Sequence, residues 1–323
     1  MIISIVATIY FIVVLNKREE KTVSLKISIL FSICLLFSSI AYLSVSAATG
    51  QKSVEVFDPH MNGYHEAVKA ENGYVYTGEF LDGYYNGEGT VKYTDGSTYV
   101  GEWKQGKRYG FGKMTFDDGS VYEGEFLSDK ENGLGKLVSA EGWSYTGEFK
   151  NGIREGKGNL VYEDGSTYTG DFKNNLPDGM GVLTHIDGFT YSGQWSAGLR
   201  NGQGILKYED GSEYSGTFKS DIQTGTGKYV SSQGWTYEGE WKDGLMHGVG
   251  KMIYKDGTTY DGEWVNNVKM GTGTQTYIDE TGAYFVTYKG ECSANKRNGE
   301  GTVTYANGYV QSGTWKDDNY MEN

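Results

Sequence analysis

Apolar and polar residues alternate along short segments of this chain, and the pattern returns every 23 residues from about residue 74 onward. In one copy Tyr145, Gly147 and Phe149 share one face of a predicted strand, and the polar residues between them share the other. Asn151-Gly152 follows and favours a type I′ turn, whose two central residues both need positive φ. A second alternating segment completes the copy. The pattern therefore predicts a β-hairpin with one packed face and one face in water.

One glycine marks the same place in every copy and so defines the length of the array. After an insertion near residues 276–285, which we expect to form a long turn or bulge, the register resumes for two more copies, giving eleven. Tandem repeats of this kind stack on one another instead of enlarging one core. We therefore expect an all-β fold, an elongated single-layer antiparallel sheet of tandem hairpins. The repeat glycines are Gly78, Gly101, Gly124, Gly147, Gly170, Gly193, Gly216, Gly239, Gly262, Gly290 and Gly313.

A second pair of glycines recurs in the return strand, as Gly156-x-Gly158 in the copy above. Glycine weakens a strand because it packs no side chain, so its repetition predicts that something large lies against the backbone there. The candidates are the Tyr and Phe/Trp rings of the same or a neighbouring hairpin.

Tyr-x-Gly-Glu-Trp, then Gly-x-Gly, then Asp-Gly-Ser at this period resembles the MORN (membrane occupation and recognition nexus) repeat, over about residues 74–316. The resemblance implies a twisted single-layer sheet of hairpins. It also implies a scaffold that dimerises or tethers proteins at membranes, and phosphoinositide binding is often proposed for the family. We expect no lipid kinase or methyltransferase domain after the repeats, and the acidity of this chain argues against phosphoinositide binding.

Two apolar stretches, residues 2–15 and 27–45, precede the repeats. The second is long enough to span a bilayer as a helix, whereas the first is short for that purpose. The basic residues between them are typical of a segment retained in the cytoplasm, which places the array outside a bacterial cell. Small residues before Ala48 also fit a cleaved secretory signal. We expect an anchor or signal region with one or two hydrophobic helices at 1–48, a linker at 49–73 and repeats at 74–323.

The charge and cysteine content narrow the range of functions. The chain has 42 acidic and 29 basic residues, a net charge of −13, so it repels phosphate, and nucleic acid is not expected as a partner. Cys292 is the single thiol outside the apolar stretches, so no intramolecular disulfide is expected in the array, and a packed apolar thiol is predicted. No arrangement of nucleophile, acid or metal ligands recurs. We predict no catalytic residue, metal or cofactor, and no enzymatic activity.

An acidic residue next to the repeat glycine recurs on the face predicted to be wet. We interpret this acidic ladder as a solvated charge lattice in which carboxylates alternate with lysines two residues further along. Calcium binding is the alternative, although it needs several oxygens converging on one ion. The ladder comprises Glu79, Glu102, Glu125, Glu148, Asp171, Glu240, Glu263 and Glu291.

Trp143, Phe189 and Trp235 follow the closing glycine in alternate copies, where the intervening copies have Ser or Thr. In the same copies a late-strand aromatic residue is replaced by Ser or His. One interpretation is compensating packing that makes a 46-residue unit. The other is a stripe of rings that contacts a partner or a glycan.

Together these features predict a non-enzymatic repeat scaffold at the membrane or cell surface, or secreted after signal cleavage, that binds another protein or itself. The alternative is a cell-surface glycan- or lipid-binding module that uses the three rings.

Overall fold

The computed structural model describes residues 58–278 and 285–322, and within them all regular structure is β. The chain divides into two compact units, Met1–Leu176 and Pro177–Asn323. The apolar stretches at residues 2–15 and 27–45, for which we predict helices, lie outside the described residues. In the described part there is no helix long and apolar enough to cross a membrane.

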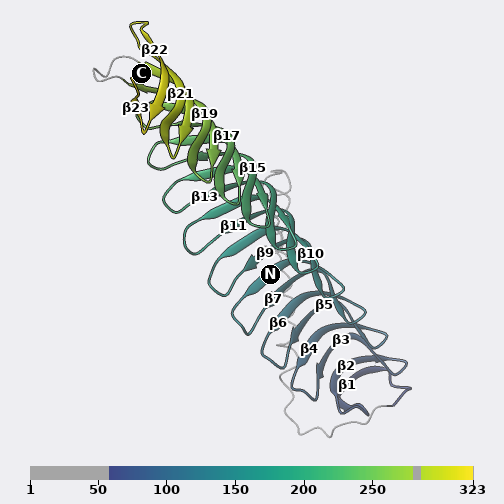
Figure 1. The fold of residues 1–323 in the computed structure, drawn as a ribbon. Coiled ribbons are helices and arrows are strands. Elements are labelled where there is room, and N and C mark those ends of the chain that lie inside the picture. The colour runs from purple at the N-terminus through teal and green to yellow at the C-terminus, as the bar shows by residue number, and fades with distance from the viewer. Residues whose placement is uncertain (1–57, 279–284, 323) are drawn as a thin grey trace, which may run out of the picture. The chain divides into compact units, whose positions relative to one another are not determined.

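Each unit is built of consecutive antiparallel strands joined by tight turns (Figure 1). The first unit contains β1 (Gly63–Lys69), β2 (Val75–Leu81), β3 (Tyr84–Lys92), β4 (Thr98–Lys104), β5 (Lys107–Thr115), β6 (Val121–Leu127), β7 (Lys130–Val138), β8 (Ser144–Lys150), β9 (Ile153–Val161) and β10 (Thr167–Lys173). Each strand from β1 to β9 pairs with the next one along the chain.

The second unit repeats this arrangement, and its first strand begins at the last residue of the first unit. It contains β11 (Leu176–Thr184), β12 (Thr190–Ser196), β13 (Leu199–Lys207), β14 (Glu213–Lys219), β15 (Ile222–Val230), β16 (Thr236–Lys242), β17 (Leu245–Ile253), β18 (Thr259–Val265), β19 (Val268–Ile278), β20 (Phe285–Ser293), β21 (Lys296–Thr304), β22 (Val310–Lys316) and β23 (Asn319–Tyr320). Successive strands again pair antiparallel.

The stretch predicted as a linker, 49–73, contains the first strand. β1 pairs with β2 and has an irregular register between His65 and Val68. Val68 is buried, and the ring of His65 meets Phe80 edge-on at 5.5 Å. The bulge shifts this strand out of the repeat register, and His65 instead of glycine lies opposite Gly78, so the repeat pattern did not reveal it.

Where a tyrosine opens the hairpin, its ring covers the glycines of its own return strand. A Cβ on Gly158 would lie 2.4 Å from ring atoms of Tyr145, which is fully buried. The Tyr145 hydroxyl donates a hydrogen bond to the carbonyl of Glu148 (3.0 Å). The prediction of a ring against the strand glycines is confirmed, and the ring belongs to the same hairpin.

The same tyrosine joins one hairpin to the next. Phe149 of its own hairpin and Phe172 of the following one meet the ring of Tyr145 edge-on, at centroid distances of 5.1 and 4.9 Å. Where tryptophan replaces phenylalanine, its indole N–H donates to a glycine carbonyl of the preceding return strand. These pairs are Trp103–Gly89, Trp195–Gly181, Trp241–Gly227, Trp264–Gly250 and Trp315–Gly301. Buried indole donors are therefore satisfied.

The predicted turns are confirmed. Asn151 and Gly152 have φ values of 54° and 82°, as a type I′ turn requires. Where the second position is not glycine it is Asn or Asp, as at Asn175 (φ 70°) and Asp221 (φ 70°), and these residues tolerate the left-handed region.

Hairpins are linked in pairs at these turns. The side chain of Asp221 accepts hydrogen bonds from the Arg200 backbone N–H (2.9 Å) and from Arg200 Nε (3.0 Å) of the preceding hairpin. The Arg200 guanidinium also lies over Phe218, 5.5 Å from the ring centroid. Arg108–Asp129, Arg154–Asn175 and Arg297–Asp318 make the equivalent contact. Between Asp129 and Asn267 the intervening hairpins have glycine at this turn position, for example Gly198, so in that stretch the linkage has a period of two repeats. Asn267, Asn295 and Asp318 then carry it in three consecutive hairpins.

This linkage gives a stability prediction. We expect Asp221→Gly to lower the free energy of unfolding by about 1–2 kcal/mol, because it removes the acceptor of two hydrogen bonds while keeping the turn conformation. Asp221→Asn keeps the acceptor, as Asn175 does, and should cost less than about 0.5 kcal/mol. Urea denaturation followed by circular dichroism measures both, and equal losses in the two variants would show that the side-chain acceptor contributes nothing.

The insertion lengthens one hairpin. β19 has 11 residues and pairs with β20 out to Ile278 and Phe285. Residues 279–284 lie outside the described part, so the long turn or bulge predicted near residues 276–285 is seen only as extra paired residues at the ends of both strands.

Candidate binding surfaces

The acidic ladder lies on the open face, which is the face of the sheet opposite the tyrosines, and five of its eight carboxylates accept a hydrogen bond from a backbone N–H. Glu148 Oε1 accepts a hydrogen bond from the N–H of Lys157, which stands between the two strand glycines (2.9 Å). The strand register shifts between Gly147 and Phe149, and Gly156 has a φ of 73°. The carboxylate therefore stabilises a β-bulge whose N–H would otherwise lack a ladder partner.

The same contact recurs along the ladder. Glu102, Glu125, Glu240 and Glu263 accept from the N–H groups of Phe111, Leu134, Val249 and Thr272 at 2.8–3.1 Å. The backbone N–H and hydroxyl of Thr272 lower the pKa of Glu263. Asp171 forms an ion pair with Lys157, a return-strand lysine and not one of those predicted to alternate with the acids. Among the described residues no group of three His, Cys, Asp or Glu side chains is arranged to hold a metal ion.

A substitution at the ladder separates this structural role from charge. We expect Glu148→Gln to change the free energy of unfolding by less than about 0.5 kcal/mol, because the amide oxygen still accepts from Lys157. Glu148→Ala should cost about 1–2 kcal/mol, because the bulge N–H loses its partner. Thermal denaturation of both variants tests this. If the Gln variant loses more than about 0.5 kcal/mol, the negative charge itself contributes to stability, which would instead favour the charge-lattice interpretation.

Trp143, Phe189 and Trp235 are each half-buried and each contacts a side chain of its own unit. The Arg154 guanidinium lies 5.2 Å from the Trp143 ring centroid. Phe189 stacks on His185 at 4.4 Å, and Trp235 stacks on Tyr229 at 5.0 Å. The contact of these rings with a partner or glycan stays a prediction.

Copies that carry Trp143, Phe189 or Trp235 differ from the intervening copies in the side chain that accepts a hydrogen bond from a backbone N–H in the closing turn. In one type of copy Asp210 accepts from the N–H of Ser212 (2.8 Å). In the aromatic-bearing copies the cap comes from the other side of the turn, as when Ser231 accepts from the N–H of Gln233 (3.1 Å). The two types are joined, since Ser212 also accepts from the N–H of Ser232 in the next turn (3.0 Å).

Cys292 occupies a Phe/Trp position and is 4% exposed, as predicted for a packed thiol. Burial raises its pKa, and the side chains around it include Tyr260 and Lys269. A buried thiol with a raised pKa is a poor nucleophile.

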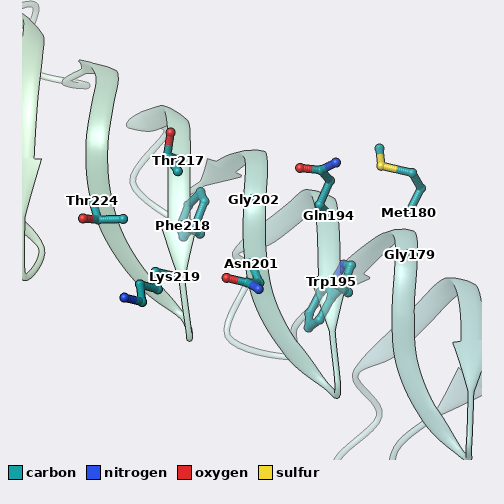
Figure 2. A pocket seen from close by; sticks show the side chains of 10 residues that line it. All are labelled: Gly179, Met180, Gln194, Trp195, Asn201, Gly202, Thr217, Phe218, Lys219 and Thr224. Atoms are coloured by element: carbon teal, nitrogen blue, oxygen red, sulfur yellow. The ribbon is translucent and has the colours of Figure 1, made fainter.

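A hollow of about 550 Å³ lies on the second unit between β11 and β15 (Figure 2). Sequence reasoning did not single it out. Its lining residues are Gly179, Met180, Gln194, Trp195, Asn201, Gly202, Thr217, Phe218, Lys219 and Thr224.

The hollow lies where the acidic ladder is interrupted, because Gln194 and Thr217 hold two successive ladder positions. Gln194 Oε1 still accepts from the bulge N–H of Gln203 (2.7 Å). Thr217 is shorter than the ladder carboxylates, and a Cβ on the nearby Gly225 would lie 3.6 Å from it, compared with 2.6 Å between Gly133 and Glu125. The sequence did contain a signal for this hollow, because two successive repeats lack the ladder acid. The regular recurrence of the acid in the other repeats obscured it.

A second hollow, about 760 Å³, lies between β17 and β22 and keeps the charged character of the ladder. Its lining includes Asp261, Glu263, Glu300 and Lys289. The first hollow therefore differs from its surroundings in chemistry as well as in shape.

The sequence model of the MORN repeat matches ten segments of the chain. They are residues 76–98, 99–121, 122–144, 145–167, 168–190, 191–213, 214–236, 237–259, 260–281 and 288–308. The chain belongs to the MORN repeat family. The resemblance proposed from the sequence is thereby confirmed, and the eleventh predicted copy lies beyond the last match, where Gln311 replaces the opening tyrosine and β22 pairs with the short β23.

No curated protein sequence matches this MORN array. Among solved structures, the TCP10 domain of Danio rerio CPAP is 12% identical, with a TM-score of 0.35, covering 60% of this chain and 91% of that one. The TCP domain of Drosophila melanogaster SAS-4, solved in complex with a proline-rich motif of Ana2, is 14% identical with a TM-score of 0.27, covering 64% and 90%. At these TM-scores nothing about the function of the array follows.

Proposed function

We propose that this MORN array is a non-enzymatic scaffold that binds a protein partner or a second copy of itself. One observation supports the proposal most. Most of the tyrosines and acids that recur in the repeats, and the arginines at the turns, are engaged in building the hairpins: tyrosines cover glycines, acids cap bulges, and arginines bind turns. The side chains that differ between repeats lie exposed on the open face, among them Val182, Ile205 and Val249, which are 44%, 41% and 57% exposed.

This division suits a scaffold, since the repeated residues hold the sheet while the variable ones are free to specify a partner. Membrane attachment through residues 27–45 is part of the proposal. Its support is the length and apolar composition of that segment and the basic residues before it.

Crosslinking on intact cells that express the tagged full chain, followed by mass spectrometry, tests the scaffold. We expect crosslinks from the open face to one or a few proteins, or to a second copy of the array. A chain that yields no intermolecular crosslink, and that is monomeric by light scattering, would contradict it.

Membrane attachment has its own test. We expect the full chain to sediment with membranes, and a variant with lysine in place of Leu35 and Leu36 to be released, because charged residues at the centre of a membrane segment cost about 2.5–3.5 kcal/mol each. Equal sedimentation of both variants would count against an anchor at residues 27–45.

A further inference from the structure

The hollow between β11 and β15 offers hydrogen-bond donors where the rest of the ladder offers carboxylates. Gln194 uses its amide oxygen to accept from Gln203, and its amide nitrogen lies on the side of Met180 (Figure 2). Asn201 supplies a second amide, and Lys219 is the charged side chain among the lining residues. An acceptor-rich or anionic group is therefore favoured here, although the ladder acids repel it elsewhere.

The two ends of the hollow differ. Lys219 lies at one end and Met180 at the other, with Asn201 and Gln194 between them (Figure 2). Met180 is 55% exposed, and a thioether adapts to apolar groups of varied shape. Trp195 and Phe218 present no open ring face, since they are 8% and 2% exposed, so the stacking surface that sugars use is lacking at this hollow.

The size of the hollow suits an extended chain. It reaches across five consecutive strands, β11 to β15, which is roughly 19 Å at the usual strand spacing. An extended segment of about six residues covers that distance.

We propose that this hollow binds an extended segment of a partner protein with a carboxylate side chain toward one end and an apolar side chain toward the other. The carboxylate meets Lys219 and the Asn201 amide, and the apolar side chain packs on Met180. The inference rests on the proposed scaffold function and assigns it a site.

The test uses the full chain in detergent micelles with ¹³C-labelled methionine methyl groups. The probe is the peptide acetyl-Gly-Ser-Leu-Glu-Leu-Glu-Ser-Gly-amide. The same peptide with Lys in place of Glu is the charge control, and maltohexaose is the glycan control. We expect the acidic peptide to shift the Met180 methyl resonance saturably and to leave Met114 and Met252, which are buried at 7% and 5% exposure, unmoved.

Thr217→Glu is the deciding variant, because glutamate is the residue of most other ladder positions and should fold there. It restores a carboxylate to the hollow, and we expect it to weaken binding of the acidic peptide at least about tenfold. Thr314→Glu adds the same charge at the equivalent position of the last hairpin and should leave the affinity within about twofold.

A Met180 resonance that does not respond to the acidic peptide overturns the site, as does an equal response to the lysine peptide, a response to maltohexaose alone, or unchanged binding in Thr217→Glu. Crosslinked partners that persist in Thr217→Glu would remove the site while leaving the scaffold function standing. A chain with neither crosslinks nor peptide binding fails both tests.

Discussion

The hairpins are expected to unfold as the pH rises from about 10 toward 12, because the tyrosines of the packed face cannot ionise where they lie. Burial raises the pKa of Tyr191, Tyr237 and Tyr288 from 10.0 to about 12. It likewise raises the pKa of Tyr76, Tyr99, Tyr122, Tyr145, Tyr214 and Tyr260. A rise in pH therefore destabilises nearly every hairpin at once.

The direction follows from proton binding. Below pH 10 the folded and unfolded chains both retain the phenolic protons, so the full stability is present. Above it the unfolded chain loses protons that the folded chain keeps, and each such tyrosine lowers the free energy of unfolding by about 1.4 kcal/mol per pH unit up to its folded pKa. Since repeats fold cooperatively with their neighbours, several tyrosines add to one transition.

Tyrosinate absorbance and circular dichroism, recorded together against pH, measure this. We expect the part of the absorbance rise that comes from the buried tyrosines to coincide with the change in dichroism. Tyr191→Phe should reduce the slope of stability against pH by about 1.4 kcal/mol per unit, whereas Tyr84→Phe, at a position 59% exposed, should leave it unchanged. A tyrosinate absorbance that reaches its full amplitude while the dichroism is intact would show that the buried hydroxyls ionise without unfolding.

Much of the hairpin could be predicted from the sequence because its causes are local. Alternation assigns Tyr145 and Phe149 to one face, and the need for positive φ assigns Asn151-Gly152 to a turn. The strand glycines also indicated a covering ring, since a strand that repeatedly gives up side-chain packing is stable only where a bulky neighbour fills the space.

What the sequence left open depends on register between strands. Glu148 reaches the N–H of Lys157 because a bulge at Gly156 brings them together, and a bulge is a property of two paired strands. The same reason hid β1, whose own bulge takes it out of the repeat pattern. The hollow at Thr217 was hidden differently, because it arises from a side chain that is shorter than its counterparts and not from a residue with chemistry of its own.

One methyl group at the centre of a hairpin should have a large effect on stability. A Cβ on Gly112 would lie 2.3 Å from the Tyr99 hydroxyl oxygen and 2.5 Å from two of its ring carbons. Tyr99 cannot move aside, because Trp103 and Phe126 meet its ring on both sides at 5.0 Å and its hydroxyl donates to the Glu102 carbonyl (3.0 Å). We expect Gly112→Ala to destabilise the protein by about 3 kcal/mol or more.

Gly119→Ala is the matched control, since no atom lies within 4 Å of a Cβ there and its cost, about 1 kcal/mol, comes only from a φ of 89°. Tyr99→Ala alone should also be destabilising, by about 3–5 kcal/mol, through the cavity it leaves. In the double variant the new methyl group enters that cavity, so urea denaturation should give a total loss smaller than the sum of the single losses by at least about 1 kcal/mol. Additive losses would mean that the glycine serves backbone conformation alone and that the ring does not require it.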